Sequence, residues 1–351
     1  MDKTTKIFTS LSVYADTDVC RWNLSQLNYL ALLNLQFENE LVDNTPAVFH
    51  WPCPYDQNFE YKISKALSIC SKVIILVSEL HHDSADFITK YQNDKIKYFV
   101  CGFVKGYPHF NWMSWFITTC YFYKSTNLLA KLNPYLVKPK TFDILLGWKK
   151  PHRNVIYDYI TNHKFSDRVI MTYFTDRSKT IDQQGIWDEN IVIPPNTFNS
   201  ITQVSHSNQY PTLSQLISVD IYNSTAYTVV CETNYDNNFS FYTEKIVKPI
   251  LAERLFIVIS GQYYLRNLRQ LGFRTFDGII DETYDTIENN AHRFQLACEQ
   301  IRYLLDQPQE EILPKIKTIT EHNKRIMLET DWHGNFIREF QAVLLEHVEQ
   351  N

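Results

Sequence analysis

Glycine is scarce in this chain, with 8 residues among 351. Phosphate-binding loops such as GxxxxGK[ST] and GxGxxG need glycine because their backbone turns tightly and approaches the phosphate closely. Neither pattern occurs, and the GxSxG turn that presents a nucleophilic serine is also missing from the sequence. The chain is therefore not expected to be a P-loop kinase, a dinucleotide-dependent dehydrogenase or a serine hydrolase.

Paired cysteines and long apolar runs are missing as well. Seven cysteines are scattered along the chain and none forms a CxxC pair, which disfavours a zinc ribbon or a disulfide framework and favours a reducing compartment. No stretch approaches about 18 uninterrupted apolar residues, and the N-terminus has no apolar signal segment. We therefore expect no transmembrane segment and a cytoplasmic protein, either free or peripheral to a membrane.

Positive charge is in slight deficit. The chain has 34 Lys and Arg against 39 Asp and Glu, a formal net charge of −5. Proteins that hold nucleic acid by bulk electrostatics are usually basic, so nucleic acid is not favoured as a partner, although a local basic cleft would still accommodate it. Basic residues are densest at residues 138–140 and 149–153.

Short apolar runs alternate with helical patterns along the chain. The expected strands lie at residues 7–14, 47–51, 73–77, 98–101, 142–146, 169–174, 227–231 and 255–259. The expected helices lie at residues 59–71, 84–91, 153–162, 244–252 and 263–271, and a helical C-terminal tail follows at residues 289–307, 310–329 and 335–350. Strands that alternate with helices predict an α/β fold with parallel sheets.

Two prolines and a basic cluster interrupt this alternation at residues 127–140, which predicts a domain boundary. We expect two Rossmann-like domains facing a cleft, an acceptor-side domain at residues 1–138 and a donor-binding domain at residues 139–351. Residues 187–223 are rich in Asn, Ser, Thr and Pro and predict a long irregular insertion. Ligands of such sheets bind beyond the carboxyl ends of the strands.

An acid and a base stand side by side where the expected helix at residues 244–252 begins. Thr243 is a candidate N-cap for this helix, and Glu244 and Lys245 follow it directly. A helix N-terminus attracts phosphate, a lysine adds full positive charge, and a carboxylate accepts hydrogen bonds from ribose hydroxyls. Glu232 ends the preceding strand and should lie at the same edge. The alternative remains that Glu244 complements the helix dipole and Lys245 is solvated.

Residues 242–245 (Tyr-Thr-Glu-Lys), with residues 230–234 (Val-Cys-Glu-Thr-Asn) upstream, resemble the donor-binding motif of the α1,3-fucosyltransferases, glycosyltransferase family 10. The resemblance implies a glycosyltransferase of the GT-B class, in which Glu244 binds the ribose and Lys245 the diphosphate of a GDP-sugar. The donor-binding residues that it implies here are Glu232, Tyr242, Thr243, Glu244 and Lys245.

A second segment supports this resemblance. Residues 151–160 (Pro-His-Arg-Asn-Val-Ile-Tyr-Asp-Tyr-Ile) resemble the stretch of bacterial fucosyltransferases in which an arginine opens a helix and clamps the diphosphate. Arg153 is the matching residue, and its planar guanidinium can hold two phosphate oxygens at once. The resemblance covers residues 142–276. It departs from the family in the long gap between Arg153 and Glu244, and it leaves the sugar open.

A transferase of this kind needs a base for the acceptor hydroxyl. Glu79, His50 and Asp18 each follow an expected strand of the first domain and are the candidates; each has the alternative of being an ordinary loop residue. Asp18 also forms an Asp-x-Asp pair with Asp16, a pattern that binds divalent cations in some transferases. Because Lys245 and Arg153 balance the diphosphate, we expect neither a metal nor another cofactor.

The sequence, taken with this resemblance, predicts a metal-independent glycosyltransferase that moves a sugar from a nucleotide-diphosphate donor to an acceptor hydroxyl, for example on a glycan. Inversion at the sugar is implied by the resemblance alone. GDP is favoured by the resemblance. Two alternatives stay open: a non-catalytic protein that only binds nucleotide sugars, and a glycosyltransferase that acts on modified DNA bases.

Overall fold

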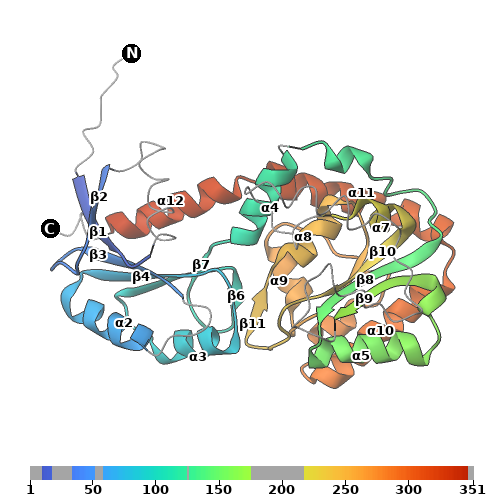
Figure 1. The fold of residues 1–351 in the computed structure, drawn as a ribbon, viewed down its shortest axis with the longest axis horizontal. Coiled ribbons are helices and arrows are strands. Elements are labelled where there is room, and N and C mark those ends of the chain that lie inside the picture. The colour runs from blue at the N-terminus through green and yellow to red at the C-terminus, as the bar shows by residue number, and fades with distance from the viewer. Residues whose placement is uncertain (1–9, 18–33, 52–57, 125, 175–216, 347–351) are drawn as a thin grey trace, which may run out of the picture. The chain divides into compact units, whose positions relative to one another are not determined.

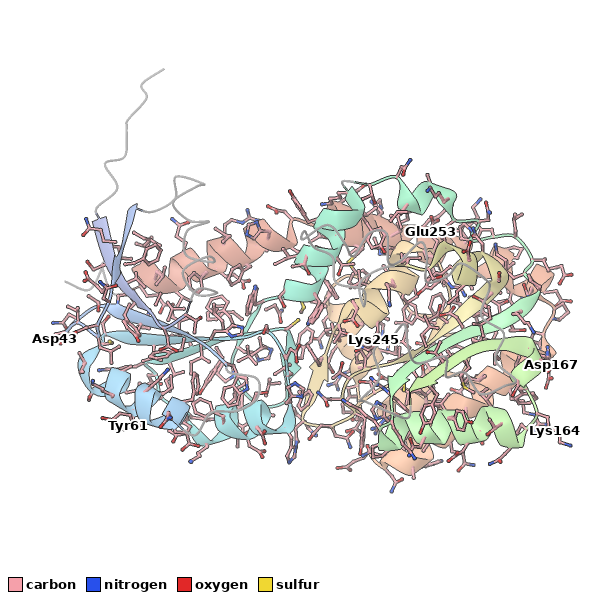
Figure 2. The ribbon with its side chains drawn as sticks, viewed as in Figure 1. Asp43, Tyr61, Lys164, Asp167, Lys245 and Glu253 are labelled. Carbon is pink, nitrogen blue, oxygen red and sulfur yellow. The ribbon has the colours of Figure 1, made fainter. Side chains whose placement is uncertain are left out.

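The computed structural model describes residues 10–17, 34–51, 58–124, 126–174 and 217–346, and Figure 2 draws most of their side chains. The chain forms two compact units, whose elements are labelled in Figure 1. Unit 1 contains Met1–Ser114 and Asp331–Asn351, and unit 2 contains Trp115–Thr330. Each unit has a parallel sheet with helices packed against it, so the chain is an α/β protein with two Rossmann-like domains, as the alternating pattern predicts.

Unit 1 is built on a six-stranded sheet in the order β2-β1-β3-β4-β5-β7, and all neighbouring strands are parallel. Its strands are β1 (Ser10–Ala15), β2 (Asn34–Glu38), β3 (Pro46–His50), β4 (Lys72–Val77), β5 (Ile96–Val100) and β7 (Phe110–Asn111), with β6 (Gly102–Val104) outside the sheet. Its helices are α2 (Asn58–Ile69), α3 (His82–Lys90) and α12 (Trp332–Leu345). Every residue of β4 is buried, which is why its sequence after Lys72 is apolar without alternation.

Helix α12 completes unit 1 although it comes last in the chain. Phe336 and Phe340 on this helix pack edge-on against Phe99 of β5, with ring centroids 5.6 and 5.1 Å apart. The ammonium of Lys72 in β4 donates to the carbonyl of Val343 at 2.6 Å and forms an ion pair with Glu346. The sheet of unit 1 therefore depends on a helix more than 200 residues away in sequence for the cover of its apolar side chains.

Unit 2 contains a four-stranded parallel sheet in the order β12-β10-β8-β9. Its strands are β8 (Lys140–Trp148), β9 (Val169–Phe174), β10 (Thr225–Cys231) and β12 (Phe256–Ile259), with β11 (Phe239–Phe241) outside this sheet. Its helices are α4 (Ser114–Lys124, of which Ser114 belongs to unit 1), α5 (Pro151–Asn162), α7 (Val219–Ser224), α8 (Glu244–Leu251), α9 (Tyr264–Gln270), α10 (Asn290–Asp306) and α11 (Gln309–Glu329). Short 3-10 turns occur at Leu128–Lys131, Ser166–Arg168 and Glu282–Thr286.

Helices cover both faces of this sheet. Helix α10 packs against α5 and β12, and α11 packs against α8, which itself packs on β10. Figure 1 shows α5 and α10 on one side of the strands and α8 and α11 on the other. Helix α5 connects β8 to β9 and α8 connects β10 to β12, so both begin at the carboxyl edge of the sheet.

A buried ion pair stabilises the interior of unit 2. Asp143 in β8 and Arg254 before β12 are 1% and 2% exposed, and Arg254 Nη2 lies 2.6 Å from Asp143 Oδ1. The guanidinium also donates to the carbonyls of Tyr222, Thr225 and Tyr227. Asp143 Oδ1 and the guanidinium are hydrogen-bonded, whereas Asp143 Oδ2 is buried without a hydrogen-bond partner among the described residues. The pair connects two strands with the residues before a third.

The unit boundary after Ser114 differs from the boundary that the sequence predicts at residue 138, and the C-terminal residues from Asp331 return to unit 1. Tertiary packing accounts for the first difference. Phe116 of α4 packs against Tyr242 and Phe273. The two prolines and the basic cluster at residues 127–140 thus lie in a connection within unit 2 and do not separate domains.

The expected strands and helices are present within a few residues of their predicted bounds, including the helical tail. Most of the irregular insertion expected at residues 187–223 lies outside the described residues. Among the described residues, no helix combines the length and apolar character needed to cross a membrane. The five described cysteines are buried and do not form disulfide bonds.

Candidate functional site

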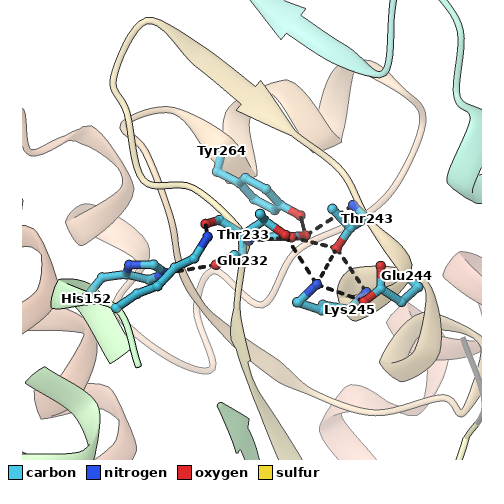
Figure 3. Close-up of polar contacts among 8 residues, drawn as sticks. His152, Glu232, Thr233, Thr243, Glu244, Lys245 and Tyr264 are labelled. Atoms are coloured by element: carbon cyan, nitrogen blue, oxygen red, sulfur yellow. Dashed lines mark hydrogen bonds and ion pairs between the residues drawn. The ribbon is translucent and has the colours of Figure 1, made fainter. Parts of the chain in front are cut away.

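The carboxyl edge of the unit 2 sheet brings two helix N-termini together. Helix α5 begins at Pro151 directly after β8, with Lys150 as its N-cap, and α8 begins at Glu244, with Thr243 as its N-cap. Strands β8 and β10 are neighbours in the sheet, so the residues that follow them lie at one edge. The polar contacts between these residues are drawn in Figure 3. N-terminal amides and the helix dipole make such an edge attractive to anions.

Thr243 caps α8, as the sequence predicts. Its backbone is extended (φ −113°, ψ −174°), and its hydroxyl oxygen accepts from the backbone N–H of Lys245 at 3.3 Å. The same hydroxyl donates to Glu232 Oε2 at 2.7 Å. The side chain is buried, so its hydrogen bonds define where α8 starts relative to the end of β10.

Glu232 follows β10 at the expected edge, but its carboxylate lies inside the protein. It is fully buried, and Tyr264 donates to its Oε1 at 2.7 Å (Figure 3). The backbone N–H groups of Thr233 and Thr243 donate to the same carboxylate at 3.3 and 3.4 Å. Burial raises the pKa of Glu232 above its ordinary value. This side chain holds the end of β10 against the start of α8.

Tyr242 is also fully buried. Its hydroxyl donates to the backbone carbonyl of Tyr264 at 3.0 Å, and its ring lies against the rings of Tyr264 and Phe116. Of the five residues of the predicted donor motif, Glu232, Tyr242 and Thr243 are therefore in the core. They position the first turn of α8.

The remaining two residues of the motif form an ion pair in that first turn. Lys245 Nζ lies 2.8 Å from Glu244 Oε1 and 3.3 Å from the hydroxyls of Thr243 and Thr233 (Figure 3). The lysine side chain is 24% exposed and the glutamate only 6%, so the ammonium is the more accessible charge. Burial alone would raise the pKa of Glu244, but the charges of Lys245 and Lys248 hold it below its ordinary value. Glu244 therefore stays ionised.

Arg153 reaches the same region from the first turn of α5. It is 5% exposed, and burial lowers the pKa of its guanidinium while the Cys231 thiol and the carboxylates of Glu232 and Glu244 act in the opposite direction. Gly147, in the left-handed region at φ +63°, leaves room for it, because a Cβ there would lie 3.3 Å from Arg153 Nη1. The structure thus brings Arg153 close to Glu244, which the sequence alone could not establish across 90 residues.

Two basic side chains outside the predicted donor motif lie in the same cluster. Lys150 donates from Nζ to the carbonyl of Thr233 at 2.7 Å. His152 is 1% exposed and its Nε2–H donates to the carbonyl of Glu232 at 2.8 Å (Figure 3). Burial, together with the nearby charges of Arg153, Lys150 and Lys245, lowers the pKa of His152 to about 4. The imidazole is therefore neutral at pH 7.

The sequence signal that could have identified Lys150 and His152 was positive charge at the start of a helix. Helix α5 has no acidic residue in its first turn, and Lys149, Lys150 and Arg153 surround its start. First turns ordinarily favour Asp and Glu because they complement the helix dipole. The basic cluster was visible in the sequence, but its link to Thr233 and Glu232 was not.

The base candidates of unit 1 lie at the carboxyl ends of two neighbouring strands. His50 ends β3, with Nε2 3.0 Å from Ser78 Oγ, and its ring lies edge-on to Trp112. Burial lowers the pKa of His50, and the charge of the nearby Glu79 partly opposes this shift. Glu79 follows β4, is 39% exposed and lies 3.1 Å from His81 Nε2. His50 and Glu79 therefore form one cluster.

The third base candidate, Asp18, lies outside the described residues. Asp16, its partner in the Asp-x-Asp pair, accepts hydrogen bonds from Lys62 and Tyr14. Within the described ranges, no group of three His, Cys, Asp or Glu side chains is placed to hold a metal ion.

No protein-family model matches the chain, and no curated protein matches it. Solved structures that are similar to it include the following two. A crystal structure of an α1,3-fucosyltransferase aligns with a TM-score of 0.42 at 11% identity, over 100% of this chain and 92% of that chain. A UDP-forming α,α-trehalose-phosphate synthase from Burkholderia xenovorans aligns with a TM-score of 0.40 at 10% identity, over 95% and 74% of the two chains.

Proposed function

We propose that unit 2 binds a nucleotide-diphosphate sugar and that the protein is a glycosyltransferase of the GT-B class that moves this sugar to an acceptor hydroxyl, for example on a glycan. One observation carries the proposal. Arg153 and Lys245 come from the first turns of two different helices, and the starts of these helices meet at Thr233, which accepts hydrogen bonds from Lys150 and Lys245. Two cations and two helix N-termini at one edge of a parallel sheet are suited to a diphosphate.

The same charges would assist the chemical step. When the bond between the sugar and the diphosphate breaks, negative charge develops on the leaving phosphate. Arg153 can offer a planar pair of donors and Lys245 a point charge to that oxygen, and both are held in place before the reaction begins. With this charge supplied by side chains, the proposal requires no metal. A GDP-sugar and inversion at the sugar carbon are the versions favoured by the resemblance to the α1,3-fucosyltransferases.

The acceptor hydroxyl must lose a proton, and His50 is the base that we favour, with Glu79 beside it. Because burial lowers the pKa of His50, its imidazole is neutral at pH 7 and able to accept a proton. The neighbouring Glu79 carboxylate would stabilise the imidazolium that forms.

A panel of nucleotide sugars tests the proposal. Thermal unfolding is followed with GDP-, UDP-, dTDP- and CMP-sugars, and the donor that raises the unfolding temperature is then assayed for release of its nucleotide with and without EDTA. We expect one nucleoside-diphosphate sugar to stabilise the protein and to be hydrolysed slowly in either condition. Lys245→Met should abolish the shift, whereas Lys315→Met, an exposed lysine on α11, should leave it unchanged.

Two outcomes would contradict the proposed glycosyltransferase function. Stabilisation without turnover of the donor, with every acceptor class supplied, would indicate a protein that only binds nucleotide sugars. No stabilisation by any donor, or equal stabilisation of the wild type and Lys245→Met, would contradict the proposed donor site.

A further inference from the structure

The start of α5 carries charge of the sign that a helix N-terminus repels. Lys150 is the N-cap, it makes no side-chain cap, and no acidic residue stands in the first turn. Helices α8 and α11 of unit 2 do carry acid there, with Glu244 in α8 and Glu310 and Glu311 in α11, whereas α4, α9 and α10 have none. A local arrangement that costs stability is characteristic of a functional position. The missing negative charge at α5 would be supplied by a ligand.

Thr233 joins the two lysines that approach this position. Lys150 Nζ, from the N-cap of α5, donates to its backbone carbonyl at 2.7 Å. Lys245 Nζ, from the first turn of α8, donates to its hydroxyl at 3.3 Å. Two ammonium groups from different helices therefore contact one half-buried residue at the end of β10. Lys149, the neighbour of Lys150 in sequence, is exposed.

We propose that Lys150 is a further binding residue for the diphosphate, and that Thr233 holds the Lys150 and Lys245 ammonium groups in position when no anion is bound. This inference rests on the proposed function of the same site. A diphosphate carries several negative charges and gains another as the sugar departs. Glu244 already offsets much of the charge of Lys245, so Arg153 and Lys245 alone leave the anion under-compensated. Lys150 supplies the third cation from a flexible stem that can transfer from a neutral carbonyl to a phosphate oxygen.

Inorganic pyrophosphate is the probe, because it tests the anion site without the base or the sugar. Its dissociation constant is measured by calorimetry on the full chain for the wild type, Lys150→Met and Lys149→Met. We expect Lys150→Met to weaken binding about 10- to 100-fold, the range for one hydrogen bond to a charged group. Lys149→Met is the matched control, since it removes the same charge one residue away, and it should change binding less than about threefold.

The salt dependence of pyrophosphate binding distinguishes direct contact of Lys150 with the anion from a purely structural role. If its ammonium contacts the anion, Lys150→Met flattens the dependence of the dissociation constant on salt concentration, and Lys150→Arg restores both affinity and slope. If it only holds Thr233 in place, the affinity falls with the slope unchanged, and the inference is overturned.

Different results would overturn the role of Lys150 and the proposed function of the site. Wild-type affinity in Lys150→Met, together with weak binding in Lys245→Met, would overturn the role of Lys150 and leave the donor site standing. No pyrophosphate binding by the wild type, in a protein that a nucleotide sugar stabilises, would also overturn it. No binding of pyrophosphate and no stabilisation by any donor would overturn both.

Discussion

His152 is the residue of the site whose protonation state is most constrained. Its pKa is lowered to about 4 in the folded protein and is near 6.5 when the chain is unfolded. Between these values the unfolded chain binds more protons than the folded one, so stability falls as the pH drops from about 6.5 to about 4. The loss attributable to this one group approaches about 3 kcal/mol.

His152→Gln tests this prediction, because a glutamine amide retains a donor for the Glu232 carbonyl but does not titrate. Urea unfolding at pH 7, 6, 5 and 4 should show that the wild type loses more stability than the variant across this range. Parallel curves for the two proteins would contradict a depressed pKa at His152.

At the scale of single residues, the sequence predicted the chemical role of a side chain better than it predicted whether that side chain is buried. Thr243 was recognisable as a cap, since a threonine before Glu-Lys at the start of an apolar helix has few other uses. That Glu232 and Tyr242 are fully buried could not be predicted, because both depend on contacts with Tyr264, which lies more than 20 residues further along. Only the folded chain shows which polar groups face the ligand and which position them.

At the scale of elements, most strands and helices were predictable, and the two main omissions have physical causes. Helix α4 (Ser114–Lys124) reads Ser-Trp-Phe-Ile-Thr-Thr-Cys-Tyr-Phe-Tyr-Lys and lacks a distinct polar face, so its periodicity is weak. Strand β2 (Asn34–Glu38) is an edge strand of five residues with mixed polarity. Both become recognisable only once their neighbours are in place.

Helix α12 offers a test of an element that acts at a distance in sequence. Phe340 is fully buried against Phe99, and Phe340→Ala should destabilise unit 1 by about 3–5 kcal/mol through lost burial and a cavity. Hydrogen exchange should show faster exchange in β4 and β5 and no change in α8. Arg338→Ala, on the same helix but exposed, should cost less than about 1 kcal/mol. Faster exchange in α8 alone would contradict the assignment of α12 to unit 1.

At the scale of the whole molecule, the division into units was the least predictable feature. Prolines and charge at residues 127–140 suggested a boundary, but a boundary is a property of packing and not of composition. The return of α12 to unit 1 has no local signal in the sequence, since an amphipathic helix does not indicate which sheet it covers.

The two units should respond differently to a ligand of unit 2. A nucleoside diphosphate at about 100 times its dissociation constant should stabilise the unit that binds it by about 2.7 kcal/mol. Hydrogen exchange across the full chain should then slow at the residues after β8 and β10 and in the first turns of α5 and α8, with the β3 and β4 amides of unit 1 unchanged. Protection confined to unit 1 would place the nucleotide elsewhere.

The late position of α12 has a consequence for how the protein is made. The ribosome synthesises the chain from its N-terminus, and unit 2 is one continuous segment of the sequence. All of unit 2 is therefore synthesised before the last helix of unit 1. Until α12 arrives, Phe99 and Trp112 have no cover from Phe336, and the first-synthesised sheet presents apolar surface to water or to a chaperone. Unit 1, whose sheet is translated first, is therefore the unit that finishes folding last.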